Sequence, residues 1–111
     1  MDNVKNDKYY ACQIIDNINA IQKYMANKSY EEFLSDQELI DAVMFRLIQS
    51  VETIKNISTE FKEQYSNIPW GDIIGFRNGI VHEYGETDYT IVYETATQDL
   101  DELKEIFNSV L

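Results

Sequence analysis

Apolar residues recur at helical spacing along nearly the whole chain, and this periodicity decides the fold class. Only four glycines and one proline interrupt the 111 residues. Two stripes follow the i, i+3, i+4, i+7 pattern of a helix with one buried face. The first consists of Ala11, Ile14, Ile15, Ile18, Ile21 and Met25. The second consists of Leu39, Ile40, Val43, Met44, Leu47, Ile48, Val51 and Ile54. These stripes predict two long amphipathic helices.

Short polar stretches mark where these helices begin and end. Residues 27–28 are predicted to close the first helix. Ser29 with Glu32, and Ser35 with Glu38, each have the spacing of a capping box. The second of these boxes is expected to lead the second long helix.

The second half of the chain predicts a short helix, a break and two further helices. Ser58 is expected to start the short helix, which runs through Tyr65. Pro69 suits a first helical position, and its helix should end at about Val81 or His82. Residues 85–88 form a loop in this interpretation. The last helix is marked by Val92, Ala96, Leu100, Leu103, Phe107 and Val110.

The chain is therefore predicted to be all-α, with one domain over residues 1–111. We expect a compact antiparallel bundle of four main helices plus one or two short ones, because the connections are short. Trp70 and the tyrosines outside position 84 are predicted to be packing residues, and Trp70 is expected to anchor the core or a dimer.

Charge and cysteine usage narrow the functional classes. Twenty acidic residues against nine dispersed basic ones give a net charge of −11, which excludes a general affinity for nucleic acid. The acidity suits a basic protein partner, or it is simply the solvated surface of the helices. No apolar run spans a bilayer and no signal-peptide pattern leads the chain, so a cytoplasmic protein without membrane contact is expected.

The scarcity of cysteine and histidine argues against a bound metal, and the lack of known binding motifs argues against a cofactor. Cys12 is the only cysteine and lies among apolar neighbours, so we expect a small buried side chain there. With one histidine, no transition-metal site is predicted. No phosphate-binding loop or dinucleotide pattern is present, and no cofactor is expected.

The chemically richest stretch is GFRNGIVHEY at residues 75–84. It holds Arg77, Asn78, Tyr84 and the only histidine, His82. Histidine moves protons near neutral pH, and arginine binds phosphate oxygens through its planar fork. Cleavage of RNA next to a 2′-hydroxyl needs both abilities. The ordinary alternative is a solvated helix face, with His82 favoured near a helix C-terminus by the dipole.

Helical geometry alone does not bring these groups together. Asn78 and His82 are four residues apart and would share a face. Arg77 and His82 are five apart, or about 140° around an ideal helix. A symmetric dimer would solve this, because it would bring two copies of each residue to the two-fold axis.

Arg77, four residues, His82, one residue and Tyr84 resemble the R-x4-H-x-Y motif of the HepT family, the DUF86 branch of the HEPN superfamily. The agreement continues in Ile68-Pro69-Trp70, Asp72-Ile73, Gly75-Phe76, Ile80-Val81, Glu83, Asp88, Ile91-Val92-Tyr93, Asp99-Leu100 and Leu103. The N-terminal half matches more loosely. Gly71 departs from the family pattern, and with it one possible phosphate contact is lost.

The resemblance implies a homodimeric toxin of a toxin–antitoxin pair that acts as a metal-independent endoribonuclease. Arg77 would bind the scissile phosphate and His82 would transfer protons. Asn78 would orient either the phosphate or the histidine. The implied antitoxin is an MntA-like nucleotidyltransferase that transfers AMP to Tyr84. Two alternatives stay open: a non-catalytic module that docks this enzyme, and a subunit that presents a small substrate to it.

Overall fold

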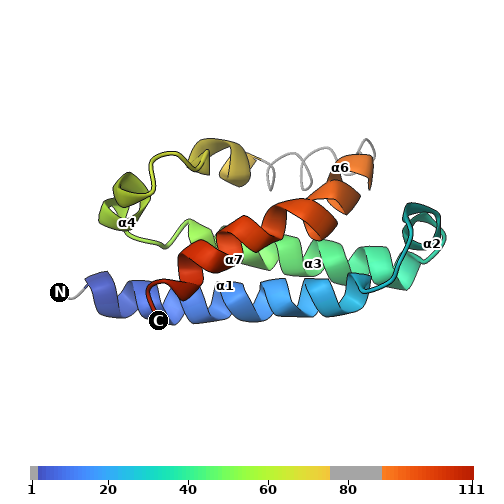
Figure 1. The fold of residues 1–111 in the computed structure, drawn as a ribbon, viewed down its shortest axis with the longest axis horizontal. Helices are drawn as coiled ribbons and strands as arrows, with labels where there is room; N and C mark the ends of the chain where they lie inside the picture. The colour runs from blue at the N-terminus through green and yellow to red at the C-terminus, as the bar shows by residue number, and fades with distance from the viewer. Residues whose placement is uncertain (1–2, 76–88) are drawn as a thin grey trace.

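The computed structural model describes residues 3–75 and 89–111, and every regular element in these ranges is a helix (Figure 1). The prediction of an all-α fold is confirmed. The elements are α1 (Asn3–Met25), α2 (Tyr30–Leu34), α3 (Gln37–Ile54), α4 (Thr59–Gln64), a helical segment at 70–75, α6 (Tyr89–Glu94), the π-helix η2 (Thr95–Asp99) and α7 (Leu100–Asn108).

The two longest helices, α1 and α3, lie side by side and form the base of the bundle (Figure 1). Both predicted stripes face this contact. All six residues of the first stripe are buried, and in the second only Leu39 and Ile48 stay half-buried. Burial of such a stripe supplies most of the stability of a helix, because isolated helices of ordinary composition are marginal in water.

The C-terminal helices cross over this base. Val92, Ala96, Leu100 and Phe107 are all buried against it. Polar contacts fix the crossing from outside, where the Gln22 amide donates to Asp101 at 2.7 Å. The start of α1 and the end of α7 lie at the same end of the bundle (Figure 1).

A π-helix interrupts the last helix, which the sequence predicts as one regular run. Val92, Ala96 and Leu100 follow each other at steps of four. In an α-helix each such step advances about 40° around the axis, so the stripe would drift off the core. The wider turn of η2, with i→i+5 bonding, takes up this drift and keeps all three side chains inside.

The first capping box is confirmed and the second is wrong. The Ser29 hydroxyl accepts from the Glu32 amide at 3.1 Å, and Glu32 accepts from the Ser29 amide at 3.2 Å. The bond from the Ser29 amide lowers the pKa of the Glu32 carboxyl most, the Ser29 hydroxyl and the charge of Lys28 lower it further, and desolvation opposes them. At α3 the cap is Asp36, which accepts from the Leu39 amide at 3.1 Å.

Ser35 fails as a cap because it still belongs to the preceding helix. Its backbone is helical at φ −90° and ψ −1°, whereas an N-cap needs the extended conformation that Asp36 adopts at φ −119° and ψ 92°. Its hydroxyl donates back to the Glu32 carbonyl at 3.1 Å. The end of the first helix is as predicted, since Asn27 takes a left-handed φ of 61°.

Cys12 is exposed, so the prediction of a buried cysteine is wrong. Its apolar neighbours are close only in sequence. Each residue of a helix turns about 100°, which places Cys12 outside the arc that carries Ala11 and Ile14. Tyr9 is also exposed, at 61%, while the other described tyrosines are half-buried as expected.

The break before the third main helix is also confirmed. Ser58 caps α4, and helical structure resumes at Trp70, directly after Pro69. The predicted end of that helix and the loop at 85–88 lie outside the described residues. Within the described ranges, no helix has the length and hydropathy needed to cross a bilayer.

A buried carboxylate joins α1 to α4. Asp7 is only 6% exposed, and its two oxygens accept from the Ser58 amide at 2.8 Å and the Ser58 hydroxyl at 2.6 Å. The same hydroxyl accepts from the Phe61 amide at 3.1 Å. Asp7 therefore holds the residue that caps α4.

Replacement of Asp7 by Ala should lower the free energy of unfolding by about 1–3 kcal/mol, because a buried amide and hydroxyl would lose their acceptor. Urea denaturation followed by far-UV circular dichroism measures the loss. Asp16→Ala is the control, since Asp16 is an exposed carboxylate of α1 and should change stability by less than about 0.5 kcal/mol. Equal losses in the two variants would contradict this account of the α1–α4 connection.

Candidate functional site

The four residues predicted to form the site, Arg77, Asn78, His82 and Tyr84, lie outside the described residues. Their mutual arrangement therefore stays a prediction. What the structure does describe is the helical segment that leads into this stretch and the helix that follows it. It also describes a groove beside the leading segment.

The leading segment is anchored by an aromatic cluster of Phe61, Trp70 and Phe107. The rings of Phe61 and Phe107 are stacked at 5.4 Å, and Trp70 meets their edges at 6.3 and 6.2 Å. The indole Nε1 of Trp70 donates to the carbonyls of Lys62 and Tyr65 at 3.1 and 3.2 Å. Trp70 is thus a core anchor, as predicted, and its expected alternative role at a dimer contact is not tested.

Burial around this cluster also affects a lysine. Lys62 is partly desolvated, which lowers the pKa of its ammonium group, and the negative charge of Asp7 opposes the effect. The Lys62 carbonyl meanwhile receives the Trp70 indole bond. The same turn of α4 therefore supports Trp70 and faces the carboxylate that holds the α4 cap.

The following helix, α6, is anchored at the opposite end of the bundle. The hydroxyls of Tyr30 and Thr90 are 2.8 Å apart, and the Tyr93 hydroxyl donates to the Lys28 carbonyl at 3.1 Å. The rings of Tyr30 and Tyr93 meet edge to face at 5.3 Å. The motif stretch thus lies, in sequence, between two anchored helical segments, one held by α4 and α7 and the other by α2 and the turn after α1.

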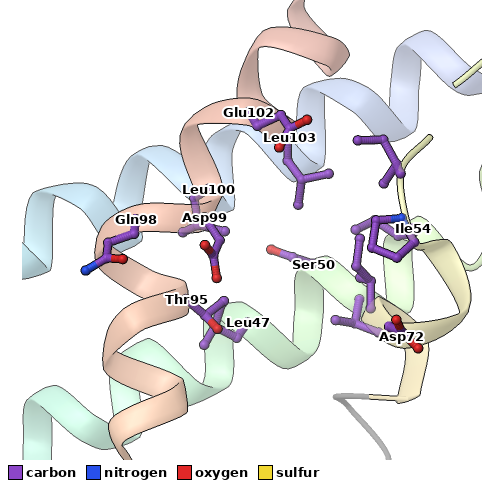
Figure 2. A pocket seen from close by; sticks show the side chains of 14 residues that line it. Leu47, Ser50, Ile54, Asp72, Thr95, Gln98, Asp99, Leu100, Glu102 and Leu103 are labelled. Atoms are coloured by element: carbon purple, nitrogen blue, oxygen red, sulfur yellow. The ribbon is translucent and has the colours of Figure 1, made fainter.

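A groove of about 370 Å³ lies between α3, residues 68–73 and the η2–α7 run. Apolar side chains from all three sides line it, among them Leu47, Ile54 and Leu103, and Ser50 and Asp99 approach from opposite walls (Figure 2). Asp72 and Ile73 also line it, five and four residues before Arg77. We refer to this hollow as the groove.

The polar lining of the groove is acidic. Asp72, Asp99 and Glu102 are all exposed, and none of their side chains bonds to another described residue. Within residues 3–75 and 89–111, no group of three histidine, cysteine or carboxylate side chains is arranged to hold a metal ion. Periodicity could not have revealed the groove, because its walls come from segments far apart in sequence.

Comparison with known proteins identifies relatives over almost the whole chain. Residues 14–110 match the family described as HepT-like, or "Ribonuclease HepT-like". "Putative RNase TTE0752" of Caldanaerobacter subterraneus is 30% identical over 108 residues, which cover 97% of this chain and 96% of that protein. "Probable ribonuclease HepT" of Thermococcus cleftensis is 28% identical over 106 residues, or 96% of each chain.

A third relative is much longer than this chain. "Gamma-glutamylcyclotransferase and putative RNase MJ0434" of Methanocaldococcus jannaschii is 33% identical over 101 residues, which cover 91% of this chain. The match spans 46% of that protein. No solved structure matches the chain significantly.

The anchoring role of Trp70 gives a graded prediction. Trp70→Ala should lower the free energy of unfolding by about 3 kcal/mol, because it removes both the ring contacts and the indole donor. Trp70→Phe keeps a ring and should lose about 1 kcal/mol for the two carbonyl contacts. Urea denaturation measures both, with the exposed Tyr9→Ala as control. Equal losses in Trp70→Phe and Trp70→Ala would show that ring packing contributes little.

Proposed function

Because the chain belongs to the HepT-like ribonuclease family, we propose that it is a metal-independent endoribonuclease that uses Arg77 and His82. The observation that carries this proposal is the family match over residues 14–110, which contains the whole R-x4-H-x-Y motif. The names of two relatives of similar length support it, since one is called "Putative RNase" and the other "Probable ribonuclease HepT".

The chemistry assigned to the motif is transesterification at an RNA phosphate. The 2′-oxygen attacks the adjacent phosphorus, the bond to the 5′-oxygen breaks, and a cyclic phosphate and a free 5′-hydroxyl result. His82 accepts the proton of the 2′-hydroxyl in its neutral form or donates one to the leaving oxygen in its charged form. Arg77 stabilises the negative charge that develops on the phosphoryl oxygens, and Asn78 orients the phosphate or the imidazole.

We further propose that the active form is a homodimer. Each chain has one histidine, whereas the reaction uses both a base and an acid. A two-fold axis beside the motif would supply two copies of His82 and of Arg77. The anchored helices on both sides of the stretch support this arrangement, because a site shared by two chains needs a fixed scaffold in each.

Control by a nucleotidyltransferase is the last part of the proposal. The Tyr84 oxygen attacks the α-phosphorus of ATP, pyrophosphate leaves and the phenolic proton passes to a base of the transferring enzyme. The attached AMP then places an anion and a purine two residues from His82. Its phosphate can pair with Arg77, and its nucleoside blocks the approach of RNA. On this account the protein is the toxin of a toxin–antitoxin pair.

The groove supports a second candidate, a subunit that presents a small substrate to a nucleotidyltransferase. Its volume of about 370 Å³ lies in the range of small-molecule sites. Its unpaired carboxylates disfavour nucleotides and other anions, so the substrate would be neutral or cationic. The names of the relatives favour the ribonuclease.

The ribonuclease proposal predicts cleavage of a fluorescent RNA by the purified protein in the presence of EDTA. His82→Ala and Arg77→Ala should each reduce the rate by about 10²–10⁴-fold, because each removes a group that acts in the transition state. Lys8→Ala, an exposed lysine of α1, is the control and should cleave like the unchanged protein. Cleavage by folded His82→Ala at the unchanged rate would refute the role of the histidine.

Adenylylation is tested separately by intact mass. After incubation with a nucleotidyltransferase encoded beside the gene, ATP and magnesium, the protein should gain mass in units of AMP and lose ribonuclease activity. Tyr84→Phe should gain none, while Tyr89→Phe, a matched tyrosine outside the motif, should gain as much as the unchanged protein. A gain without any ribonuclease activity in the unmodified protein would favour the non-catalytic docking module instead.

A further inference from the structure

The groove combines a hydrophobic floor with a rim of one charge sign. Its floor is formed by buried or half-buried aliphatic side chains, including Leu47 and Ile54 of α3 and Leu103 of α7 (Figure 2). The carboxylates of Asp72, Asp99 and Glu102 stand around it, the first on the segment 70–75 and the other two on the η2–α7 run. An apolar floor with a charged rim is the arrangement of a recognition site for a side chain that is aliphatic in its body and charged at its tip.

Among the described residues, no basic group lines the groove to balance these carboxylates. Its described lining contains no lysine, arginine or histidine. Ser50 is only 5% exposed and donates its proton to the Arg46 carbonyl at 2.8 Å, so its oxygen is left as an acceptor toward the groove. The strongest polar groups of the lining are therefore hydrogen-bond acceptors and anions, which matches a cationic occupant.

The charge of the chain decides between possible occupants. A nucleic acid would meet three carboxylates in a protein of net charge −11. A second copy would carry the same charge, and a two-fold contact at the groove would set each acidic rim against its equivalent. A basic segment of a different protein fits both the floor and the rim.

We propose that the groove is a docking site for a basic amphipathic segment of a partner protein. A leucine-like side chain of the partner lies on the floor against Leu47, Ile54 and Leu103. A flanking lysine or arginine lies among Asp72, Asp99 and Glu102. This surface is independent of the ribonuclease proposal, because it is built entirely from residues outside the motif.

A partner docked at the groove would contact the helical segment 70–75, which precedes the motif in sequence. Asp72 and Ile73 belong to the helical segment 70–75, and Trp70 at its start is fixed in the aromatic cluster. A partner held between this segment and α7 would brace the segment from its other side.

The probe is a short helical peptide with one leucine flanked by lysines on the adjacent turns, and its counterpart carries glutamates in place of the lysines. Titration into ¹⁵N-labelled protein should shift the amide signals of Ser50, Asp72 and Leu103. The lysine peptide should bind and the glutamate peptide should not. No shift of these signals at millimolar lysine peptide would overturn the proposal.

Two kinds of variant separate the rim from the floor. The first is a triple variant that combines Asp72→Asn, Asp99→Asn and Glu102→Gln. Its affinity for the lysine peptide should be about tenfold lower, as expected for the loss of three exposed ion pairs. The triple control Asp16→Asn, Glu63→Gln and Glu105→Gln removes the same charge from exposed positions outside the groove and should bind like the unchanged protein. If both triple variants lost the same affinity for the peptide, net charge alone would explain the effect and the proposed site would be wrong.

The hydrophobic floor can be tested by a larger side chain that fills the groove and leaves the charge of the protein unchanged. Ser50→Leu should abolish peptide binding while the midpoint of urea unfolding does not fall, because leucine fills space beside other aliphatic side chains. Thr95→Leu fills the groove from the opposite wall and serves if Ser50→Leu does not fold. If Ser50→Leu instead dissociates a dimer in sedimentation equilibrium, a second copy occupies the groove and the proposal is wrong.

Discussion

The stacked pair of Phe61 and Phe107, with Trp70 against its edge, is the contact on which the second half of the molecule depends. α4 and α7 carry its two fully packed rings, and the segment 70–75 begins at the third. α4 contributes only one short helix and would not be stable alone. Its position follows from this cluster and from the hold of Asp7 on its cap. The direction in which the chain enters the motif is therefore set at one end of the bundle.

The opposite end is fixed by different means. There α6 is tied to α2 and to the turn after α1 through tyrosine hydroxyls and an edge-to-face ring pair. The groove lies along the C-terminal half of α3. Its other walls are residues 68–73 and the η2–α7 run. The acidic residues that stand around this opening are exposed and bond to no other described residue, so their carboxylates are accessible to a partner.

The fold was predictable from the sequence where burial alone decides it. The stripes of α1 and α3 are long, and a periodic signal of this length identifies both the helix and its buried face. The predictions that failed concern single residues, whose role depends on local backbone geometry. Ser35 and Asp36 both have side chains suited to a cap, and the choice fell on Asp36 because only its backbone had left the preceding helix. The burial of Cys12 was predicted wrongly from neighbours in sequence rather than from helix angle.

The π-helix at 95–99 shows a second feature that the periodicity of the sequence could not predict. The steps of four between Val92, Ala96 and Leu100 were visible in the sequence, but regular helical geometry tolerates some drift, so they did not require a wider turn. Only the packing of η2 on α1 imposes it. The groove is a tertiary feature of the same kind, since no spacing within α3 or α7 indicates that their side chains leave a hollow.

For the candidate site, the sequence supplied the chemistry and the structure supplies its setting. Arg77 and His82 were recognisable because scarce residue types cluster in an acidic chain, and Asn78 and Tyr84 were recognisable by the resemblance to the R-x4-H-x-Y motif. The same acidity sets a constraint on any ribonuclease built on this scaffold. RNA must be held at the motif itself, because the described surface around the groove repels it. The carboxylates that disfavour RNA at the groove are the same groups that would attract a basic partner there.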